Sequence, residues 1–502
     1  MLTTLAAPAF ADIWHIENGD ITISAGESGN NVTQNNNTTY GDTNTIITNQ
    51  NKDTASSHTV TIEAKDKDDK VEVTLKDVNI DTSSRNKAAV SVTGEGDTNI
   101  KLDGDNALKS DIYRSGIYGS GSLTISGGEN DSLTAQGGSG ANGISSSGSL
   151  TISGGTVTAN GDDGGRGISS SGSVTISGGS TVTANGGSGT ISGGDGIWSG
   201  GGVTISGGST VTANGGNGGS LVGGSGISNG GSLTVSDGTV TAKGGNGDSK
   251  DGYGGDGIRS GGVVTISGNT VNAAGGYGGK VGGYGICSFD RVAISGGTVE
   301  AAGGNGSTGG GSGIYSSVID LSGSLELTAK AGSPNGKALS QKGSELVLDT
   351  IKDKLGPGAK VTATDADGKV IDQVPIPRPV EPEKPVIPEE SSSSSDGGSA
   401  TPSAPTSPLP GLTVTDKDGQ RISYTSTQSG NTLTVCVGRF TASFRISLAA
   451  LRQLRAEGIE TITFQTILCS TTLSVDELLA MGGEDAEAVL THRSTDSSLT
   501  VG

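Results

Sequence analysis

The chain has 502 residues, 90 of them glycine, with 3% aromatic residues and a formal net charge of −20. Each glycine in a helix interior costs about 1 kcal/mol relative to alanine, so this glycine content argues against a mainly helical fold. The acidic balance argues against a nucleic-acid partner, which needs clustered lysine and arginine, and without a run of about 20 apolar residues no membrane span is expected.

Residues 1–11 resemble the end of a secretory signal peptide. A short apolar run precedes the small-residue pattern Ala-Phe-Ala at positions 9–11, which is typical of a signal-peptide cleavage site. We therefore expect residues 1–11 to be the remnant of a signal peptide. The protein is then secreted, extracellular or displayed on a bacterial cell surface. A disordered terminus is the alternative interpretation.

Three segments that follow alternate apolar and polar residues but lack the glycine-rich corners of the later sequence. They cover residues 20–24, 60–83 and 88–108, and alternation with a period of two is typical of β-strands. We interpret them as the first, less regular coils of a domain that spans residues 12–372. The asparagine-rich segment 30–51 within this domain is an insertion or an end cap.

A repeat dominates the middle of the chain, and one copy reads GISSSGSLTISGGTVTANG at Gly143–Gly161. Gly-Ile steps mark the copies at intervals of 24–31 residues, with isoleucine at 117, 144, 168, 197, 227, 258, 286 and 314. Apolar and polar residues alternate through LTIS and TVTA, and the length differences fall in the glycine-rich stretch that follows. A constant core with variable loops predicts a mainly β fold, a parallel β-helix (β-solenoid) whose regular coils cover residues 114–330.

The sequence changes character after the repeats. Residues 373–410 hold ten of the 13 prolines together with a run of five serines, which predicts a semi-extended linker. Residues 411–502 combine strand-like segments such as NTLTVCVG with short helical segments such as LAALRQLRAEG. We expect a small α+β C-terminal domain here, and its sequence indicates no functional site.

The chain offers few residues for catalysis. Its three histidines, His15, His58 and His492, lie far apart in sequence, and no metal-ligand spacing or nucleophile motif is present. Three cysteines do not make a disulfide scaffold, and the sequence leaves open whether Cys436 and Cys469 pair. We therefore expect a protein that is not an enzyme.

One acidic loop keeps a catalytic alternative open. Some β-helix enzymes cleave acidic polysaccharides with an arginine or lysine base beside carboxylate-bound calcium. The segment NGDSKDGYGGDGIRS comes nearest to that pattern, with Asp248, Asp251, Asp256 and Arg259. A solvated acidic loop with a surface arginine is the simpler interpretation.

Calcium is a candidate ligand of the glycine-rich corners, because aspartate oxygens in such loops are hard ligands. The candidate residues are Asp162, Asp163, Asp195 and Asp256. The nonapeptide repeat G-G-x-G-x-D-x-U-x is not present as a period, which excludes that particular calcium-binding mechanism.

One column of outward residues gathers aromatic side chains. If the isoleucine of each Gly-Ile step points inward, the next residue points outward, and stacked coils align these residues about 4.8 Å apart. The column then contains Tyr118, Ser145, Ser169, Trp198, Ser228, Arg259, Cys287 and Tyr315. Sugar rings stack on exposed aromatic rings. Our candidate ligand-binding residues are Tyr118, Trp198, Arg259 and Tyr315, with Tyr253, Tyr277 and Tyr284 from the adjacent loops. The alternative is that these rings only cover the edge of the solenoid.

A column of threonines runs through six successive copies. Its members are Thr124, Thr151, Thr175, Thr204, Thr234 and Thr265. Threonine is favoured in strands and stabilises cross-strand pairs, so the first interpretation is structural. The alternative is a flat hydroxyl array that lies along a polymer or along ice, and the unequal coil lengths argue against ice.

The succession of VEVTLKDVNIDTS, AAVSVTGEGDTNIKLDGDNAL, GIYGSGSLTISGG and GISSSGSLTISGGTVTANG resembles a family of secreted bacterial carbohydrate-binding β-helix domains. These domains occur in cell-surface proteins of anaerobic Gram-positive bacteria, and the resemblance covers residues 60–330. It implies a right-handed parallel β-helix that binds plant-type polysaccharide, with calcium, without cleaving it. The family offers no short ligand motif, so no binding residue is carried over.

The sequence supports three functional hypotheses. The first is a secreted or cell-surface, non-catalytic protein that binds a plant-type or cell-wall polysaccharide. The second is a polysaccharide lyase or hydrolase of the β-helix type. The third is a structural adhesin or spacer that presents the C-terminal domain.

Overall fold

The computed structural model describes residues 12–375 and 411–501, apart from 417–419, 423, 430, 438–440, 467–469, 484–485 and 493–496. The chain forms two compact units, Met1–Lys384 and Pro385–Gly502, and each is described by itself. The predicted signal-peptide remnant, most of the predicted linker and Cys469 lie outside the described residues.

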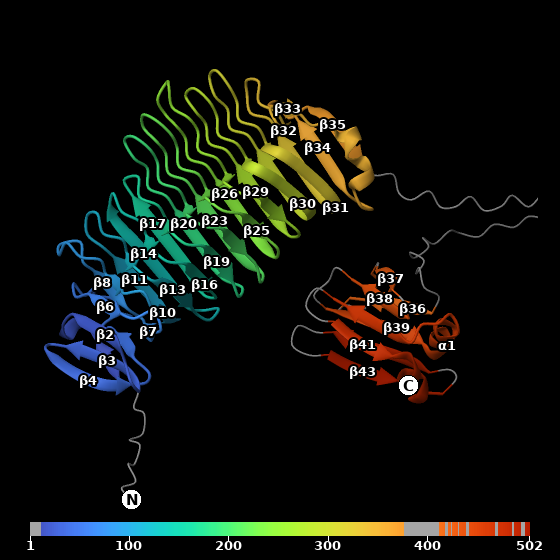
Figure 1. The fold of residues 1–502 in the computed structure, drawn as a ribbon, viewed down its shortest axis with the longest axis horizontal. Coiled ribbons are helices and arrows are strands. Elements are labelled where there is room, and N and C mark those ends of the chain that lie inside the picture. The colour runs from blue at the N-terminus through green and yellow to red at the C-terminus, as the bar shows by residue number, and fades with distance from the viewer. Residues whose placement is uncertain are drawn as a thin grey trace, which may run out of the picture. The chain divides into compact units, whose positions relative to one another are not determined.

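The first unit is a β-solenoid of about 13 turns, which confirms the fold predicted from the repeat. Each regular turn contributes three short strands, and equivalent strands of successive turns pair in parallel (Figure 1). The pairing produces three columns. The first contains the Gly-Ile steps, the second the LTIS segments and the third the TVTA segments.

The three columns have the following strands. The first contains β2 (Ile21–Gly26), β6 (Val60–Glu63), β9 (Val90–Thr93), β12 (Ile117–Gly119), β15 (Ile144–Ser146), β18 (Ile168–Ser170), β21 (Ile197–Ser199), β24 (Ile227–Asn229), β27 (Ile258–Ser260) and β32 (Leu339–Gln341). The second contains β1 (Ile13–His15), β5 (Ile46–Thr48), β7 (Lys70–Lys76), β10 (Asp97–Asp103), β13 (Ser122–Ser126), β16 (Leu150–Ser153), β19 (Val174–Ser177), β22 (Val203–Ile205), β25 (Leu233–Val235) and β28 (Val264–Ile266). The third contains β8 (Asn79–Asp81), β11 (Asp105–Lys109), β14 (Ser132–Ser139), β17 (Thr156–Asp162), β20 (Thr181–Asn185), β23 (Ser209–Asn214), β26 (Gly238–Lys243), β29 (Thr270–Ala274) and β34 (Lys360–Thr364). Two long strands, β30 (Ile286–Ala302) and β31 (Ile314–Lys330), run through all three columns.

Side chains from all three columns fill one continuous core. In the copy at Gly143–Gly161, the side chains with no exposed surface include Ile144, Leu150, Ile152, Val157 and Ala159. These are the inward positions that the alternation predicts. Because each one stacks on its equivalents in the neighbouring coils, burial is completed only by repetition.

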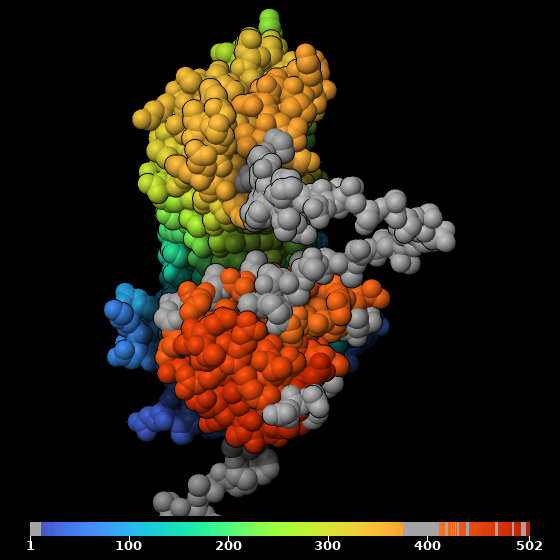
Figure 2. Space-filling model, turned by 90° about the vertical axis from the view of Figure 1, so that its right-hand side faces the viewer, coloured from blue at the N-terminus to red at the C-terminus, as the bar shows by residue number. Residues whose placement is uncertain are grey.

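Antiparallel strands close both ends of the solenoid. At the N-terminal end β2 pairs with β3 (Gly29–Gln34), which pairs with β4 (Asn37–Asp42), so the asparagine-rich segment includes part of an end cap. At the C-terminal end β34 pairs with β35 (Val370–Pro375), and β33 (Ser344–Glu345), η2 (Leu348–Thr350) and η3 (Lys352–Lys354) complete the cap. Figure 2 shows the orange residues of this cap over the end of the solenoid. Such caps occupy strand edges that otherwise invite pairing with another chain.

The glycine-rich stretches form an ordered projection that we call the glycine fin. It consists of the loops 186–196, 215–226, 244–257, 275–285 and 303–313, which lie side by side along one edge of the solenoid (Figure 1, green to yellow). Isolated parallel bridges join the loops in two rows, for example Gly218 to Gly247 and Val222 to Tyr253. The length differences between coils do fall here, as expected, but the loops are not irregular.

A chain of backbone hydrogen bonds explains why the fin contains so much glycine. Gly216 donates to Gly194 of the preceding loop, Gly224 donates to Gly216, and Gly245 donates to Gly224, each at 2.8 Å. The outgoing and returning halves of the loops therefore pack backbone against backbone. A Cβ atom on Gly224 would lie 1.9 Å from the carbonyl oxygen of Gly194, so no larger residue fits without displacing the loop.

The second unit is a small α+β domain, as predicted. One sheet contains β36 (Leu412–Thr415), β39 (Ala442–Ser447), β42 (Glu487–His492) and β43 (Ser497–Val501). The other contains β37 (Thr425–Ser429), β38 (Thr432–Cys436), β40 (Thr461–Gln465) and β41 (Ser470–Ser474). Helices α1 (Leu448–Ala456) and α2 (Val475–Ala480) are N-capped by Ser447 and Ser474, whose hydroxyls accept backbone N–H groups of the first turn.

A buried histidine lies in the core of this domain. The ring of His492 is fully buried beside Phe444, with centroids 5.5 Å apart, and its Nε2 lies 3.0 Å from the Thr471 hydroxyl. Burial lowers the pKa of His492, because the charged imidazolium loses its hydration.

We expect the C-terminal domain to lose stability as the pH falls below about 6.5, the ordinary histidine pKa. The unfolded chain then binds a proton that His492 takes up only at lower pH in the folded state, so acid favours unfolding. Hydrogen exchange of the β42 amides in the full chain, followed from pH 7.5 to 5, measures this effect. His492→Gln is expected to flatten the pH dependence, whereas His58→Gln in the solenoid leaves it unchanged.

Candidate functional site

The residues that follow the first-column isoleucines form one file along the solenoid. Strand pairing aligns them in the order Tyr118, Ser145, Ser169, Trp198, Ser228, Arg259, Cys287 and Tyr315. Towards the N-terminus the file continues through Ser91 and Thr61. We call the surface along this file the first-column face.

Cys287 and Ser169 differ from the other residues of the file because they are buried, with 2% and 7% of their surface exposed. Both lie in the predicted outward file, but neither is accessible at the surface. Tyr315, the residue that follows Cys287 in the file, stacks on Tyr284 with ring centroids 5.0 Å apart. Burial, together with the charge of Asp256, raises the pKa of the Cys287 thiol to about 12, so the thiol stays protonated at neutral pH.

Trp198 lies in the middle of the file and is held by an arginine. The guanidinium carbon of Arg166 lies 4.3 Å from the Trp198 ring centroid, and Arg166 Nε lies 3.4 Å from a carboxylate oxygen of Asp195. The other oxygen of Asp195 accepts the Ser225 N–H at 2.8 Å. Arg166 was missed in the sequence because it precedes a Gly-Ile step, where the alternation of strands no longer applies.

A similar arrangement recurs around Arg259. Its guanidinium lies 3.3 Å from Asp256, and its carbon lies 5.1 Å from the ring centroid of Phe289. Asp256 is buried and also accepts the N–H of Tyr284 at 2.7 Å. Burial raises the pKa of the Asp256 carboxyl, although the Tyr284 hydrogen bond and the charge of Arg259 act in the opposite direction. Burial likewise raises the pKa of Asp195.

A cavity of about 370 Å³ opens beside Arg259, between the first-column face and the glycine fin. Tyr253, Asp256, Arg259 and Tyr284 line it, together with Val222 and Val281 from the fin. We call it the fin pocket. It brings together three of the predicted ligand-binding residues, Tyr253, Arg259 and Tyr284. Tyr277, 48% exposed, lies in the fin but does not line this pocket.

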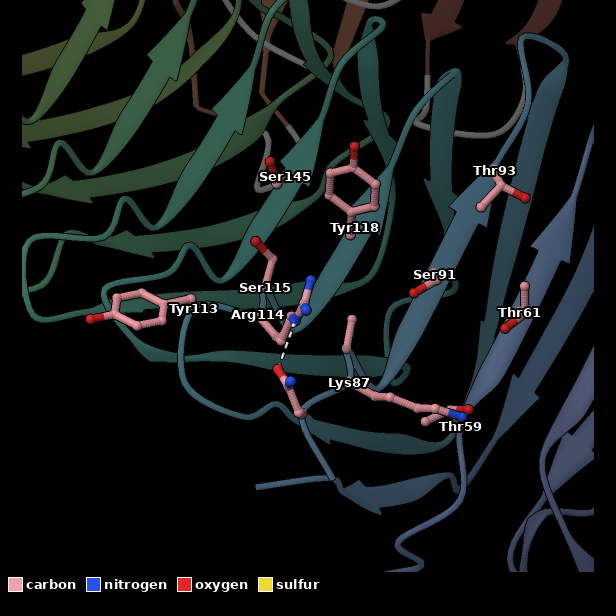
Figure 3. Close-up of a pocket in the computed structure, with 12 residues that line it drawn as sticks. Thr59, Thr61, Lys87, Ser91, Thr93, Tyr113, Arg114, Ser115, Tyr118 and Ser145 are labelled. Atoms are coloured by element: carbon pink, nitrogen blue, oxygen red, sulfur yellow. Dashed lines mark hydrogen bonds between the residues drawn. The ribbon is translucent and has the colours of Figure 1, made fainter. Parts of the chain in front are cut away.

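A larger cavity of about 670 Å³, the N-terminal pocket, surrounds Tyr118 (Figure 3). Tyr113, Arg114 and Lys87 line it, and strand hydroxyls such as that of Ser91 face it. The Arg114 Nε donates to the Asn86 side chain at 3.3 Å. Among the aromatic and cationic residues of this pocket the sequence indicated only Tyr118, because Tyr113, Arg114 and Lys87 lie outside the strands, where no periodic pattern applies.

A cluster of cations borders the N-terminal pocket. Asp20 accepts hydrogen bonds from Arg85 at 2.9 Å and from Lys87 at 3.0 Å, and His58 Nδ1 lies 3.2 Å away. Partial burial alone raises the pKa of Asp20, but hydrogen bonds from the Thr59 N–H and from these side chains outweigh it and hold the pKa well below its usual range. The carboxylate is therefore ionised at neutral pH, and two fixed cations surround one anion.

The predicted calcium ligands do not converge. Asp195 and Asp256 each pair with an arginine. Asp162 ends β17, and the N–H of Asp163, the residue after it, donates to the Asp162 carboxylate at 2.9 Å. Within residues 12–375 and the described parts of 411–501, no group of three or more His, Cys, Asp or Glu side chains is placed to hold a metal ion.

The second-column threonines are aligned without a register shift. Pairing runs from Thr124 through Thr151, Thr175, Thr204 and Thr234 to Thr265. Unequal coil lengths do not disturb this alignment, because the extra residues lie in the glycine fin. The threonine hydroxyls therefore form a continuous array despite the unequal coil lengths. The structure indicates no ligand for this array.

In the described part of the chain, no helix has the length and apolarity to cross a membrane. A comparison with known proteins finds no matching family model, no similar curated protein and no similar solved structure.

Proposed function

We propose that this chain is a secreted or cell-surface protein that binds a polysaccharide along the first-column face without cleaving it. The observation that carries the proposal is the fin pocket, where Arg259 and two tyrosines converge. Aromatic rings stack on the apolar faces of sugars, and a few polar groups set their orientation. Trp198 and Tyr118 extend the same chemistry along the face.

The placement of the arginines, and not the acidic overall charge, supports an acidic polysaccharide. The chain carries −20 overall, and five arginines lie between residues 12 and 375. Three of the five, Arg114, Arg166 and Arg259, lie on or beside the first-column face. Arginine binds planar carboxylates through hydrogen bonds. Arg166 and Arg259 each use one nitrogen to pair with an aspartate, so we assign recognition of uronic acid groups to their other N–H groups and to Arg114.

The lining of the two pockets supports binding rather than hydrolysis. Glycosidases generally need two carboxyl groups that flank the scissile bond. Asp256 is the carboxylate of the fin pocket, and it is occupied by Arg259 and the Tyr284 N–H. The alternative is a lyase that uses Arg259 as its base, and release of unsaturated sugar ends from polygalacturonate distinguishes it. A spacer that presents the C-terminal domain would show neither binding nor cleavage.

Trp198 provides a direct test. In a Trp14→Phe background it is the single tryptophan, and titration of the full chain with polygalacturonate is expected to change its fluorescence in a saturable way. Trp198→Ala removes this reporter, so its binding is measured by calorimetry, and we expect it to be about tenfold weaker because one stacking surface is lost. Tyr40→Ala, which removes an aromatic side chain 77% exposed on β4, serves as the matched control.

The proposal is contradicted if polygalacturonate leaves the Trp198 fluorescence unchanged and the immobilised protein does not retain it. A neutral polysaccharide such as dextran, titrated in parallel, separates acidic recognition from general sugar binding. Repeating the titration with a calcium chelator tests the calcium that the family resemblance implies.

A further inference from the structure

We propose that the fin pocket and the N-terminal pocket bind a single linear polysaccharide chain that lies parallel to the solenoid axis. The ligand is then an extended internal stretch of a polymer rather than a short oligosaccharide or a chain end. This inference rests on the proposed function, and it deepens it by specifying the length and direction of the ligand.

The register of the first column sets the distance between the pockets. Tyr118 lines the N-terminal pocket and Arg259 lines the fin pocket, and the two residues belong to the same file. Five pairing steps separate them, through Ser145, Ser169, Trp198 and Ser228. At about 4.8 Å per step, the pockets are about 24 Å apart along the axis.

The two pockets offer the same combination of groups. Arg114 and Lys87 accompany Tyr118 in the N-terminal pocket, whereas Arg259 accompanies Tyr253 and Tyr284 in the fin pocket. Each pocket therefore combines a cation with aromatic rings. A polymer of identical acidic units can satisfy both, whereas two unlike ligands would need unlike pockets.

Tyr113 adds an independent indication at the N-terminal pocket. It is 78% exposed and has a φ of 57°, in the left-handed region that non-glycine residues rarely adopt. Such backbone strain tends to occur at ligand-binding positions, and here it presents an aromatic ring to solvent beside the cavity.

The surface between the pockets leaves room for a chain. Three of the four intervening residues in the file are serines, which project little from the strands. The fourth is Trp198, with Arg166 stacked on its ring, and this pair repeats the combination of a cation and an aromatic ring between the two pockets. A cation and an aromatic ring therefore occur together at three places along the file: the N-terminal pocket, the Trp198–Arg166 pair and the fin pocket.

A polysaccharide chain that occupies both pockets binds more tightly than two separate oligomers, because its sugar units are covalently linked. Once one pocket is occupied, the second binding step becomes intramolecular, which raises the affinity by up to 10²- to 10⁴-fold when the geometry matches. If one sugar unit spans about one coil step of ~4.8 Å, about six units reach from one pocket to the other. Shorter chains occupy each pocket separately.

Size-fractionated oligogalacturonates from two to twelve units test the inference by calorimetry with the full chain. We expect weak binding of two short oligomers per chain, and a rise in affinity of at least tenfold, with a stoichiometry of one, at about six to eight units. The double variant Arg114→Ala/Tyr118→Ala is expected to abolish this rise and to reduce the stoichiometry for short oligomers to one. Tyr40→Ala/Arg291→Ala, which alters an exposed tyrosine and an exposed arginine outside the first-column face, is the matched control.

Affinity that does not depend on length, or a length dependence that survives in the Arg114→Ala/Tyr118→Ala variant, overturns the shared-chain inference and leaves the proposed function standing. No binding of oligomers of any length, or of polygalacturonate itself, overturns the proposed function and the inference together.

Discussion

Replacing Gly224 with alanine is expected to destabilise the glycine fin by about 3 kcal/mol. The new Cβ atom would lie 1.9 Å from the carbonyl oxygen of Gly194 and 2.4 Å from its carbonyl carbon. These contacts are with backbone, so no side chain can rotate away. The loop must move, and the hydrogen bonds that Gly224 shares with Gly216 and Gly245 are lost with it.

Gly309→Ala is the matched control within the same fin. A Cβ atom there meets only the Val281 methyl groups, at 3.8 and 3.9 Å, which is ordinary contact. Because solenoid repeats open locally, hydrogen exchange of the fin amides is the suitable measurement, with circular dichroism reporting on the rest of the solenoid. The two variants should differ by about 3 kcal/mol in the opening free energy of loop 215–226.

Equal exchange rates in the two variants would show that the fin is not the close-packed backbone layer described here. The fin also forms a wall of the fin pocket through Val222 and Tyr253. Gly224→Ala is therefore also expected to weaken binding of polygalacturonate, although no fin glycine contributes a side chain to the ligand.

Replacing Arg259 with alanine is expected to weaken polygalacturonate binding about ten- to a hundredfold at pH 7. The guanidinium is the cation of the fin pocket, and a hydrogen bond to a charged group contributes about 1.5–3 kcal/mol. Arg259→Lys is expected to recover part of this loss, because lysine keeps the charge but not the planar pair of donors.

The same substitution changes the pH dependence of stability. Arg259 lowers the pKa of Asp256, so its removal leaves burial opposed mainly by the Tyr284 N–H hydrogen bond and raises that pKa further. A carboxyl with a raised folded-state pKa contributes stability at low pH, and this contribution is lost as the pH rises through the folded-state value. Arg259→Ala is therefore expected to be most destabilising at neutral pH, and Asp256→Asn, introduced together with it, to remove this dependence.

Arg291→Ala removes an exposed arginine elsewhere on the solenoid and controls for the loss of one positive charge. If it weakens binding as much as Arg259→Ala does, the interaction is a general effect of charge and the fin pocket is not the site. Thermal unfolding at pH 5 and pH 7.5 separates the effect on Asp256 from the effect on the ligand.

The fold could be predicted because the information is local and repeated. Aliphatic residues equivalent to Ile144, Ile152 and Val157 recur in each regular coil, and a period of two determines which side chains face inward. The same alternation placed Tyr118, Trp198 and Arg259 in one outward file. The α+β class of the C-terminal domain was likewise predictable from the segments themselves, whereas the pairing of β38 with β40 depends on residues far apart in sequence.

The candidate site could be predicted only in part. Arg166, Arg114 and Lys87 lie in turns, where no periodic pattern indicates the direction of a side chain, and only the folded backbone brings them to the first-column face. Conversely, Tyr315 lies in the predicted file, but its ring stacks on Tyr284. That contact depends on the path of the loop that precedes β30.

By itself, the sequence determined the solenoid, its inward residues and the alignment of its outward ones, because these follow from strand geometry repeated at short range. The tertiary structure decided which outward residues are accessible and where the pockets open. It also decided that the glycine-rich stretches form an ordered fin, because a hydrogen bond such as that from Gly224 to Gly216 forms part of a chain that exists only once successive coils have stacked.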